Sequence, residues 1–148
     1  MKIALYIFIG LVLFVMIAFF LLGKKSQKGT ALGLAGGHLT PCGSKPNCVC
    51  SEQDRSIAMK ANMGANIAPL DLSWDELKAA IKGQGGVIVK EEDGYLSATF
   101  TSKVFKFVDD FEARQDGDVI HIRSASRVGY SDRGINRARV QALRATVK

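Results

Sequence analysis

The sequence predicts an α+β fold in which an N-terminal transmembrane helix precedes a two-layer domain. Three observations predict it. A long uncharged run opens the chain, apolar residues recur at helical spacing around residues 73–83 and 131–148, and they alternate with a period of two in between. The 148 residues leave room for one domain. The expected order is β-α-β-β-β-β-α, an antiparallel sheet of four to five strands covered on one face by two helices.

The run Ile3–Leu22 holds no charged residue. As a helix it would extend about 30 Å, the thickness of the hydrocarbon core of a bilayer. A cleavable signal peptide is the alternative, but its apolar region is usually shorter, about 7–15 residues, and small residues follow it. Here one small residue, Gly23, follows the run, and two lysines, Lys24 and Lys25, come directly after it. We therefore predict that residues 1–25 form an uncleaved transmembrane signal anchor.

Three segments follow the anchor. Residues 26–37 are rich in Gly, Ser, Gln and Lys and predict a flexible tether. Residues 38–61 contain the cysteines in a loop segment, and residues 62–148 carry the periodic patterns of an α+β globular domain. Positive charge is concentrated at the end of the chain, because residues 121–148 hold seven basic residues and one acidic residue.

The cysteine segment allows three interpretations. A disulfide between Cys42 and Cys48 would require an oxidising compartment, a metal site could combine His38 with the three cysteines, or the thiols are reduced and inert. We favour the disulfide without a metal, which leaves the role of Cys50 open. The disulfide predicts a periplasmic or luminal domain, although three lysines after the uncharged run Ile3–Leu22, against one before it, favour the opposite orientation.

The globular domain begins with a predicted short strand over Asn66–Leu70. A helix follows from Ser73 to Gly83, because Ser73 and Glu76 have the spacing of a capping box. Four strands are predicted next, over Val87–Glu91, Tyr95–Thr101, Val104–Ala113 and Val119–Val128.

Tight turns between these strands would place the apolar residues of every strand on one face. Two-residue turns are expected at Asp93-Gly94, Ser102-Lys103 and Asp116-Gly117. They set Val89 opposite Ala98 on the apolar face and Glu112 beside His121 on the polar face, which we interpret as a solvated surface rather than a ligand site. Asp109 falls on the apolar face, where a carboxylate needs a partner, so we predict a structural ion pair with an arginine of the next segment.

Three segments carry a family resemblance: Cys42–Ser51, Phe107–Glu112 and Arg123–Arg139. They resemble the Cys-Pro-x-Ser-Pro-Asn-Cys-Val, Phe-Val-Asp-Asp and Ser-Arg-Val-Gly-Tyr-Ser-Asp-x-Gly-x-Asn-Arg motifs of a family of bacterial and plastid proteins known only as a domain of unknown function. Gly43 replaces the usual proline, and Cys50 stands where serine is common. The resemblance implies an exported or membrane-anchored protein and supplies no activity.

The third motif concentrates polar side chains at one strand-to-helix corner, where Ser131 or Asp132 can cap the following helix. Guanidinium groups beside a helix N-terminus suit phosphate or carboxylate, so the corner is a candidate anion site, with a hydrogen-bonded brace as the alternative. The candidate residues are Arg127, Tyr130, Ser131, Asp132, Asn136, Arg137 and Arg139.

We expect a membrane-anchored, non-catalytic binding or accessory domain of the cell envelope. Its partners would be the membrane and an anionic small molecule or an envelope protein. A small acid–base enzyme using Asp109, Asp132 and Tyr130 is one alternative, and thiol redox or metal handling by Cys42, Cys48 and Cys50 is the other. The sequence contains no nucleophile elbow, P-loop or dinucleotide fingerprint, so we expect no cofactor, and the near absence of aromatic residues in the basic tail argues against nucleic acid.

Overall fold

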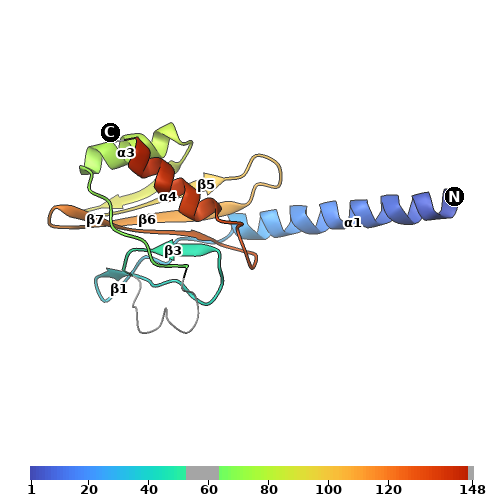
Figure 1. Cartoon of the computed structure of the whole chain (residues 1–148), viewed down its shortest axis with the longest axis horizontal. Helices are drawn as coiled ribbons and strands as arrows, with labels where there is room; N and C mark the ends of the chain where they lie inside the picture. Colours follow the sequence, from blue (N-terminus) through green and yellow to red (C-terminus); the bar gives the residue numbers. More distant parts are fainter. Residues whose placement is uncertain (53–63, 147–148) are drawn as a thin grey trace.

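The computed structural model describes residues 1–52 and 64–146 and confirms the α+β class (Figure 1). The predicted boundary between the cysteine segment and the globular domain, at residues 61 and 62, lies outside the described residues. The helices are α1 (Lys2–Gln27), α3 (Trp74–Gly83) and α4 (Ile135–Ala145). The strands are β1 (Leu34–Ala35), β2 (His38–Leu39), β3 (Cys48–Cys50), β4 (Val87–Glu92), β5 (Tyr95–Thr101), β6 (Val108–Asp116) and β7 (Val119–Ser126).

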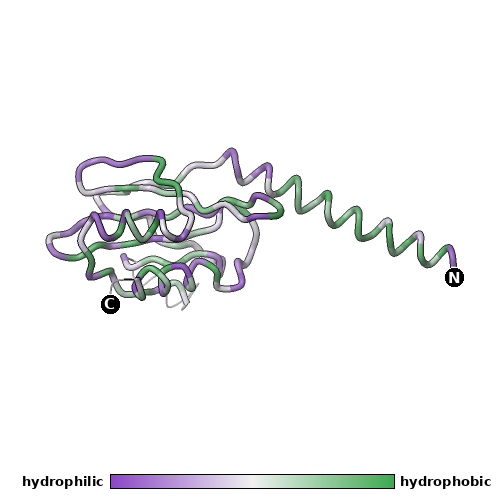
Figure 2. The backbone as a smooth tube through the Cα atoms, turned by 90° about the horizontal axis from the view of Figure 1, so that it is seen from above, coloured by the Kyte–Doolittle hydropathy of each residue, from purple (hydrophilic) through white to green (hydrophobic). Residues whose placement is uncertain are grey.

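Helix α1 projects from the domain as a rod whose surface is apolar along most of its length (Figure 2). It is long and apolar enough to span a membrane. Gly23 and Ser26 are its buried residues, and both lie near its C-terminal end. The domain therefore packs against the last turns of α1 and leaves the rest exposed.

Five strands form one antiparallel sheet in the order β3-β7-β6-β5-β4. Helices α3 and α4 lie together on one face of this sheet (Figure 1). Leu77 of α3 and Leu143 of α4 are fully buried there, in one hydrophobic core with Phe111 and Ile122 of the sheet. The core occupies this face, so the opposite face is left for polar side chains.

The fifth strand is not the one that the sequence predicts. The strand β3 pairs with β7, whereas the run over residues 66–70 forms isolated bridges, one from Asn66 to β3 and one from Leu70 to β7. This run leads from β3 at Asn66 to β7 at Leu70. Because Pro69 has no N–H to donate, the run cannot extend its pairing with either strand.

Each of the three registers predicted from the tight turns contains an error, and the reasons differ. A β-bulge in β4 puts Ile88, rather than Val89, opposite Ala98, and leaves Val89 exposed. Between β6 and β7, Glu112 lies opposite Arg123 rather than beside His121. That second error is a shift of two residues, which preserves the face of every side chain because the side-chain period of a strand is two.

The connection between β5 and β6 is longer than the predicted two-residue turn. It runs from Ser102 to Phe107, and β6 begins at Val108. The Ser102 amide donates to the Phe107 carbonyl at 2.8 Å, and the Phe107 amide donates to the Ser102 hydroxyl at 2.9 Å, which closes a defined loop. Helix α3 starts as predicted, with the reciprocal capping box of Ser73 and Glu76.

Candidate functional site on the polar face of the sheet

The polar face, opposite α3 and α4, is covered at its centre by the chain that follows α1. Glu112 is completely buried there and accepts hydrogen bonds from the Gly33 amide at 2.6 Å, the Tyr95 hydroxyl at 2.9 Å and Arg123 at 2.8 Å. Burial and then the charge of Glu112 raise the pKa of Tyr95 far above its usual range, so the hydroxyl remains a donor. The expectation of a fully solvated face is therefore wrong at its centre.

A second ion pair on this face joins the sheet to α1. Arg127 donates to both carboxylate oxygens of Asp110, from Nε at 2.8 Å and from Nη2 at 2.7 Å. Its Nη1 donates to the Ser26 carbonyl in the last turn of α1 at 3.1 Å. A bidentate pair fixes the guanidinium in one orientation, so Arg127 connects α1 to β6.

A third carboxylate, Glu52, holds the segment around β2 to the sheet. It accepts hydrogen bonds from Arg114, with Nη2 at 2.5 Å, and from the Leu39 amide at 2.7 Å, and its Oε1 lies 2.9 Å from Nδ1 of His38. Burial raises the pKa of Glu52, but the hydrogen bonds from Arg114, His38 and Leu39 outweigh burial and lower it to about 2. This carboxylate is therefore ionised at any physiological pH.

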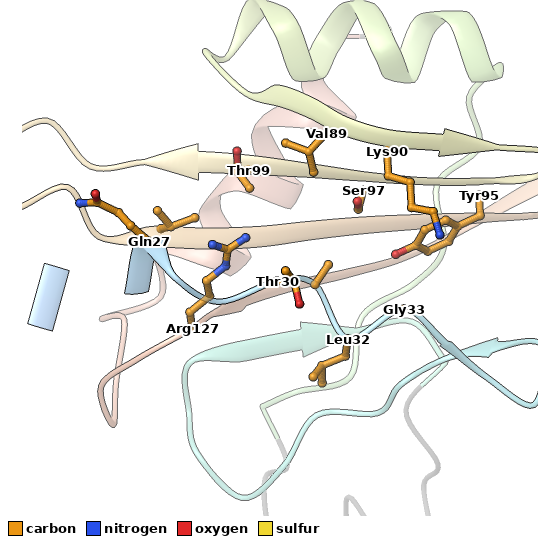
Figure 3. A pocket seen from close by; sticks show the side chains of 12 residues that line it. Gln27, Thr30, Leu32, Gly33, Val89, Lys90, Tyr95, Ser97, Thr99 and Arg127 are labelled. Carbon is orange, nitrogen blue, oxygen red and sulfur yellow. The ribbon is translucent and has the colours of Figure 1, made fainter. Parts of the chain in front are cut away.

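A groove of about 680 Å³ opens between the chain after α1 and the strands β4 and β5 (Figure 3). At one end Lys90 lies over the ring of Tyr95, with Nζ 5.8 Å from the ring centroid, and at the other end lie Gln27 and Arg127 (Figure 3). Between them the lining combines hydroxyl groups with apolar side chains, contributed by Thr30, Leu32, Val89, Ser97 and Thr99. The groove is therefore amphipathic and begins where α1 ends.

The strand-to-helix corner is held together by contacts within the chain. Nη2 of Arg139 lies 2.8 Å from the Asp109 carboxylate, and its guanidinium carbon lies 4.3 Å from the centroid of the Phe100 ring. Its Nη1 donates to Ser124 at 3.0 Å and to Asn136, which is fully buried. Asp109 thus pairs with an arginine of α4, and the Arg139 guanidinium braces α4 against the sheet.

The N-terminus of α4 already carries an acidic side chain. The Asp132 carboxylate accepts the Gly134 amide at 2.9 Å and the Asn136 amide at 2.8 Å. The first N–H groups of a helix have no partner within the helix, and an anion bound at a helix N-terminus would accept hydrogen bonds from them. The chain's own carboxylate therefore occupies the position that a bound phosphate would take.

The other residues of the candidate anion corner do not converge on one point. Arg127 lies on the polar face, whereas Arg139 pairs with Asp109 on the helix-covered face. Arg137 donates to the carbonyls of Gly64 and Asn66, and Tyr130 is 72% exposed. The hydroxyl of the remaining member, Ser131, accepts the amide of Arg133. The arrangement is that of a structural brace.

The predicted disulfide between Cys42 and Cys48 is present. Cys50 is a free, fully buried thiol, and burial raises its pKa to about 11, which keeps it protonated and unreactive. Within residues 1–52 and 64–146, no three His, Cys, Asp or Glu side chains are grouped so that they could hold a metal ion.

Apart from Arg127, the groove residues are absent from the candidate residues predicted from the sequence, although two signals point to them. The alternation of Tyr95, Ser97 and Thr99 in β5 places three hydroxyl groups on one face. The pair Gly36-Gly37, with positive φ at both residues, forms the turn between β1 and β2 that keeps the N-terminal chain beside the sheet. Neither signal shows by itself that a groove is left open between them.

Comparisons with known proteins give one match. No curated protein and no solved structure matches the chain. The family described as Protein of unknown function (DUF1499) matches residues 38–147, a region that contains the five-stranded sheet, α3, α4 and the three cysteines. The chain therefore belongs to the DUF1499 family.

Proposed function

We propose that the protein is a single-pass membrane protein whose domain binds a ligand without catalysis, in the groove on its polar face. The observation that carries the proposal is the junction between α1 and the domain. Ser26, in the last turn of α1, is fully buried; its hydroxyl donates to the Gly23 carbonyl at 2.7 Å and accepts the Val108 amide at 3.0 Å. Helix α1 thus supplies the hydrogen-bond acceptor for the first residue of β6.

The same junction supports an uncleaved anchor over a removable signal peptide. A Cβ atom on Gly23 would lie 1.8 Å from the carbonyl oxygen of Phe105, so the two backbones are in direct contact. Removal of α1 would also leave the Val108 amide and Nη1 of Arg127 without the partners they have here. Unpaired buried polar groups cost about 1–3 kcal/mol each, so cleavage would weaken the domain.

The disulfide supports a domain on the outer side of the membrane. A bond between Cys42 and Cys48 persists in an oxidising compartment such as the periplasm or a lumen. The lysines after α1 favour the other orientation, but the charge difference across the helix is small. We therefore place the domain in the periplasm or lumen.

The chemistry of the groove supports binding rather than reaction. Asp110 and Glu112, the carboxylates beneath it, are held in ion pairs with arginines. The lining then offers hydroxyl groups, the amine of Lys90, which also lies 2.9 Å from the Glu92 carboxylate, and apolar surface on Leu32 and Val89. This set fits an amphipathic ligand with an anionic head, and the position of the groove beside the end of α1 supports a ligand taken from the membrane surface.

A binding measurement tests this proposal. The full chain in a neutral detergent is unfolded by heat with short-chain phosphatidylglycerol or with phosphatidylcholine of the same acyl length. We expect phosphatidylglycerol to raise the Tm by several degrees and phosphatidylcholine to raise it less, because only the first carries a net negative charge to interact with the amine of Lys90.

Two matched variants locate the binding. Val89→Trp fills the groove and should abolish the shift, whereas Val87→Trp, at a comparably exposed valine of the same strand outside the groove lining, should keep it. No difference between the two lipids, or an equal shift in both variants, would contradict the proposal.

A further inference from the structure

The loop between β5 and β6 lies beside the membrane helix. Residues 102–107 leave the sheet at the end where α1 departs and extend along the last turns of α1, and both views agree on this placement (Figures 1 and 2). Half of the six loop residues are large and apolar: Val104, Phe105 and Phe107. Val104 is 72% exposed.

Aromatic contacts fix the loop to α1. The ring of Phe19 in α1 lies 5.2 Å from that of Phe105 and 6.1 Å from that of Phe107, measured between centroids. The Gln27 side chain donates to the Lys106 carbonyl at 3.2 Å. These contacts hold the loop beside the segment of α1 from Phe19 to Gln27.

That position corresponds to the edge of the hydrocarbon core. Phe19 lies three residues before Leu22, the end of the uncharged run, which is about 4.5 Å along a helix axis. If α1 spans the bilayer, as proposed above, Phe105 lies at the boundary between acyl chains and headgroups, and the exposed Val104 meets lipid rather than water. Apolar side chains at that depth are stabilised by burial in the acyl region.

The charges around the loop complement anionic headgroups. Lys103 and Lys106 flank its apolar tip, and Lys24, Lys25 and Lys28 follow the uncharged run of α1. The acidic residues near the start of β6, Asp109 and Asp110, are paired with arginines. The connection from β7 to α4, which contains the exposed Tyr130, emerges at the same end of the sheet, and tyrosine is enriched at membrane interfaces.

We infer that residues 102–107 form a second membrane-contacting element, which inserts Val104 and Phe105 at the headgroup–acyl boundary of an anionic bilayer. This inference depends on the proposed anchoring by α1. It adds that the domain is not merely tethered but docked on the lipid in one orientation, with the end of the sheet that carries the loop facing the bilayer.

Quenching of tryptophan fluorescence by brominated lipids tests the inference. The chain has one tryptophan, Trp74, at the start of α3 on the side of the domain away from α1 (Figure 1). Two variants move it: Trp74→Phe/Val104→Trp reports on the loop, and Trp74→Phe/Phe14→Trp reports on α1. Each full-length protein is reconstituted into bilayers of phosphatidylcholine and phosphatidylglycerol brominated either near the headgroup or near the chain ends.

We expect bromines near the headgroup to quench most of the emission of a tryptophan at position 104, and bromines near the chain ends to quench it less. A tryptophan at position 14 should be strongly quenched, and Trp74 should be little quenched. Lys103→Glu in the position-104 variant should weaken its quenching, because it removes a charge that faces the anionic headgroups.

Other outcomes overturn one proposal or both. Quenching at position 14 without quenching at position 104 would reject loop insertion and leave the anchor intact. A blue-shifted but unquenched tryptophan at 104 would show that protein, such as a second copy of the chain, covers the loop, which also rejects insertion. An unquenched tryptophan at position 14 would reject the anchor itself.

Discussion

At the scale of single residues, carboxylates organise the polar face. Glu112 and Glu52 each collect donors from segments far apart in the sequence, including the backbone amides of Gly33 and Leu39. Hydrogen bonds to an ionised carboxylate are among the stronger ones in proteins, and a buried carboxylate requires them. The N-terminal chain is therefore held to the sheet by charge and hydrogen bonding more than by apolar packing.

Glu52 should make the stability of the protein sensitive to acid. Its pKa is about 2 in the folded protein against 4.5 for a free carboxyl, so unfolding takes up a proton between these values. The stabilisation is complete above about pH 4.5 and is lost as the pH falls toward 2. We expect Glu52→Gln to lower the free energy of unfolding by about 3 kcal/mol at pH 7 and to flatten its pH dependence in that window. Chemical denaturation across pH 2–7 measures both, and an unchanged slope would contradict the assignment.

Cys50 should be chemically silent in the folded protein. Its thiol is buried and its pKa is raised to about 11, so little thiolate exists at neutral pH. We expect a thiol reagent at pH 8 to find no reactive thiol in the native chain, one after denaturation, and three after denaturation with reduction, because Cys42 and Cys48 are bonded. Three thiols before reduction would show that the disulfide does not form in the cell.

At the scale of elements, the sequence predicts local structure better than pairing. The capping box, the alternation in β5 and the apolar stripe of α4 depend on neighbours in the sequence, and each predicts its element correctly. The bulge at Val89 and the loop over residues 102–107 depend on what packs against them, which is a matter of tertiary contact. Asp109 is placed correctly on the helix-covered face, but the covering of Glu112 depends on the path of residues 28–39 and could not be predicted from periodicity.

The brace between α4 and the sheet should contribute strongly to the stability of the domain. Arg139→Ala leaves the Asp109 carboxylate without its ion-pair partner and removes the contact with Phe100, so we expect a loss of about 3 kcal/mol in urea unfolding. Arg133→Ala, at an exposed arginine of the connection before α4, should change stability by less than about 0.5 kcal/mol. If Arg139→Ala keeps full stability and instead abolishes stabilisation by phosphatidylglycerol, the corner is a ligand site and the brace interpretation fails.

The contact between α1 and the loop should be sensitive to one methyl group. Gly23→Ala places a Cβ atom 1.8 Å from the Phe105 carbonyl oxygen and must separate the helix from the loop. We expect the Tm of the domain to fall, although alanine is the better helix former by about 1 kcal/mol. Gly10→Ala, where a Cβ atom meets nothing within 4 Å, is the matched control and should leave the Tm unchanged. Equal Tm values for the two variants would mean that α1 is not packed as described.

At the scale of the whole molecule, α1 packs against the domain as part of one structure and is not a separate helix joined to it by a linker. Ser26 and Arg127 join the last turn of α1 to β6, the groove begins at Gln27, and the loop over residues 102–107 reaches back along α1. Each of these features requires α1 to stay attached. A binding site built at this junction would present its ligand at a fixed height above the bilayer.

The intact mass of the protein extracted from alkaline-washed membranes tests this account most directly. We expect a single species that retains residues 2–27, remains in the membrane after the wash and carries the oxidised Cys42–Cys48 pair. A chain that begins after Gly23 and is released by the wash would contradict it, because the helix that completes the domain would then be a discarded leader.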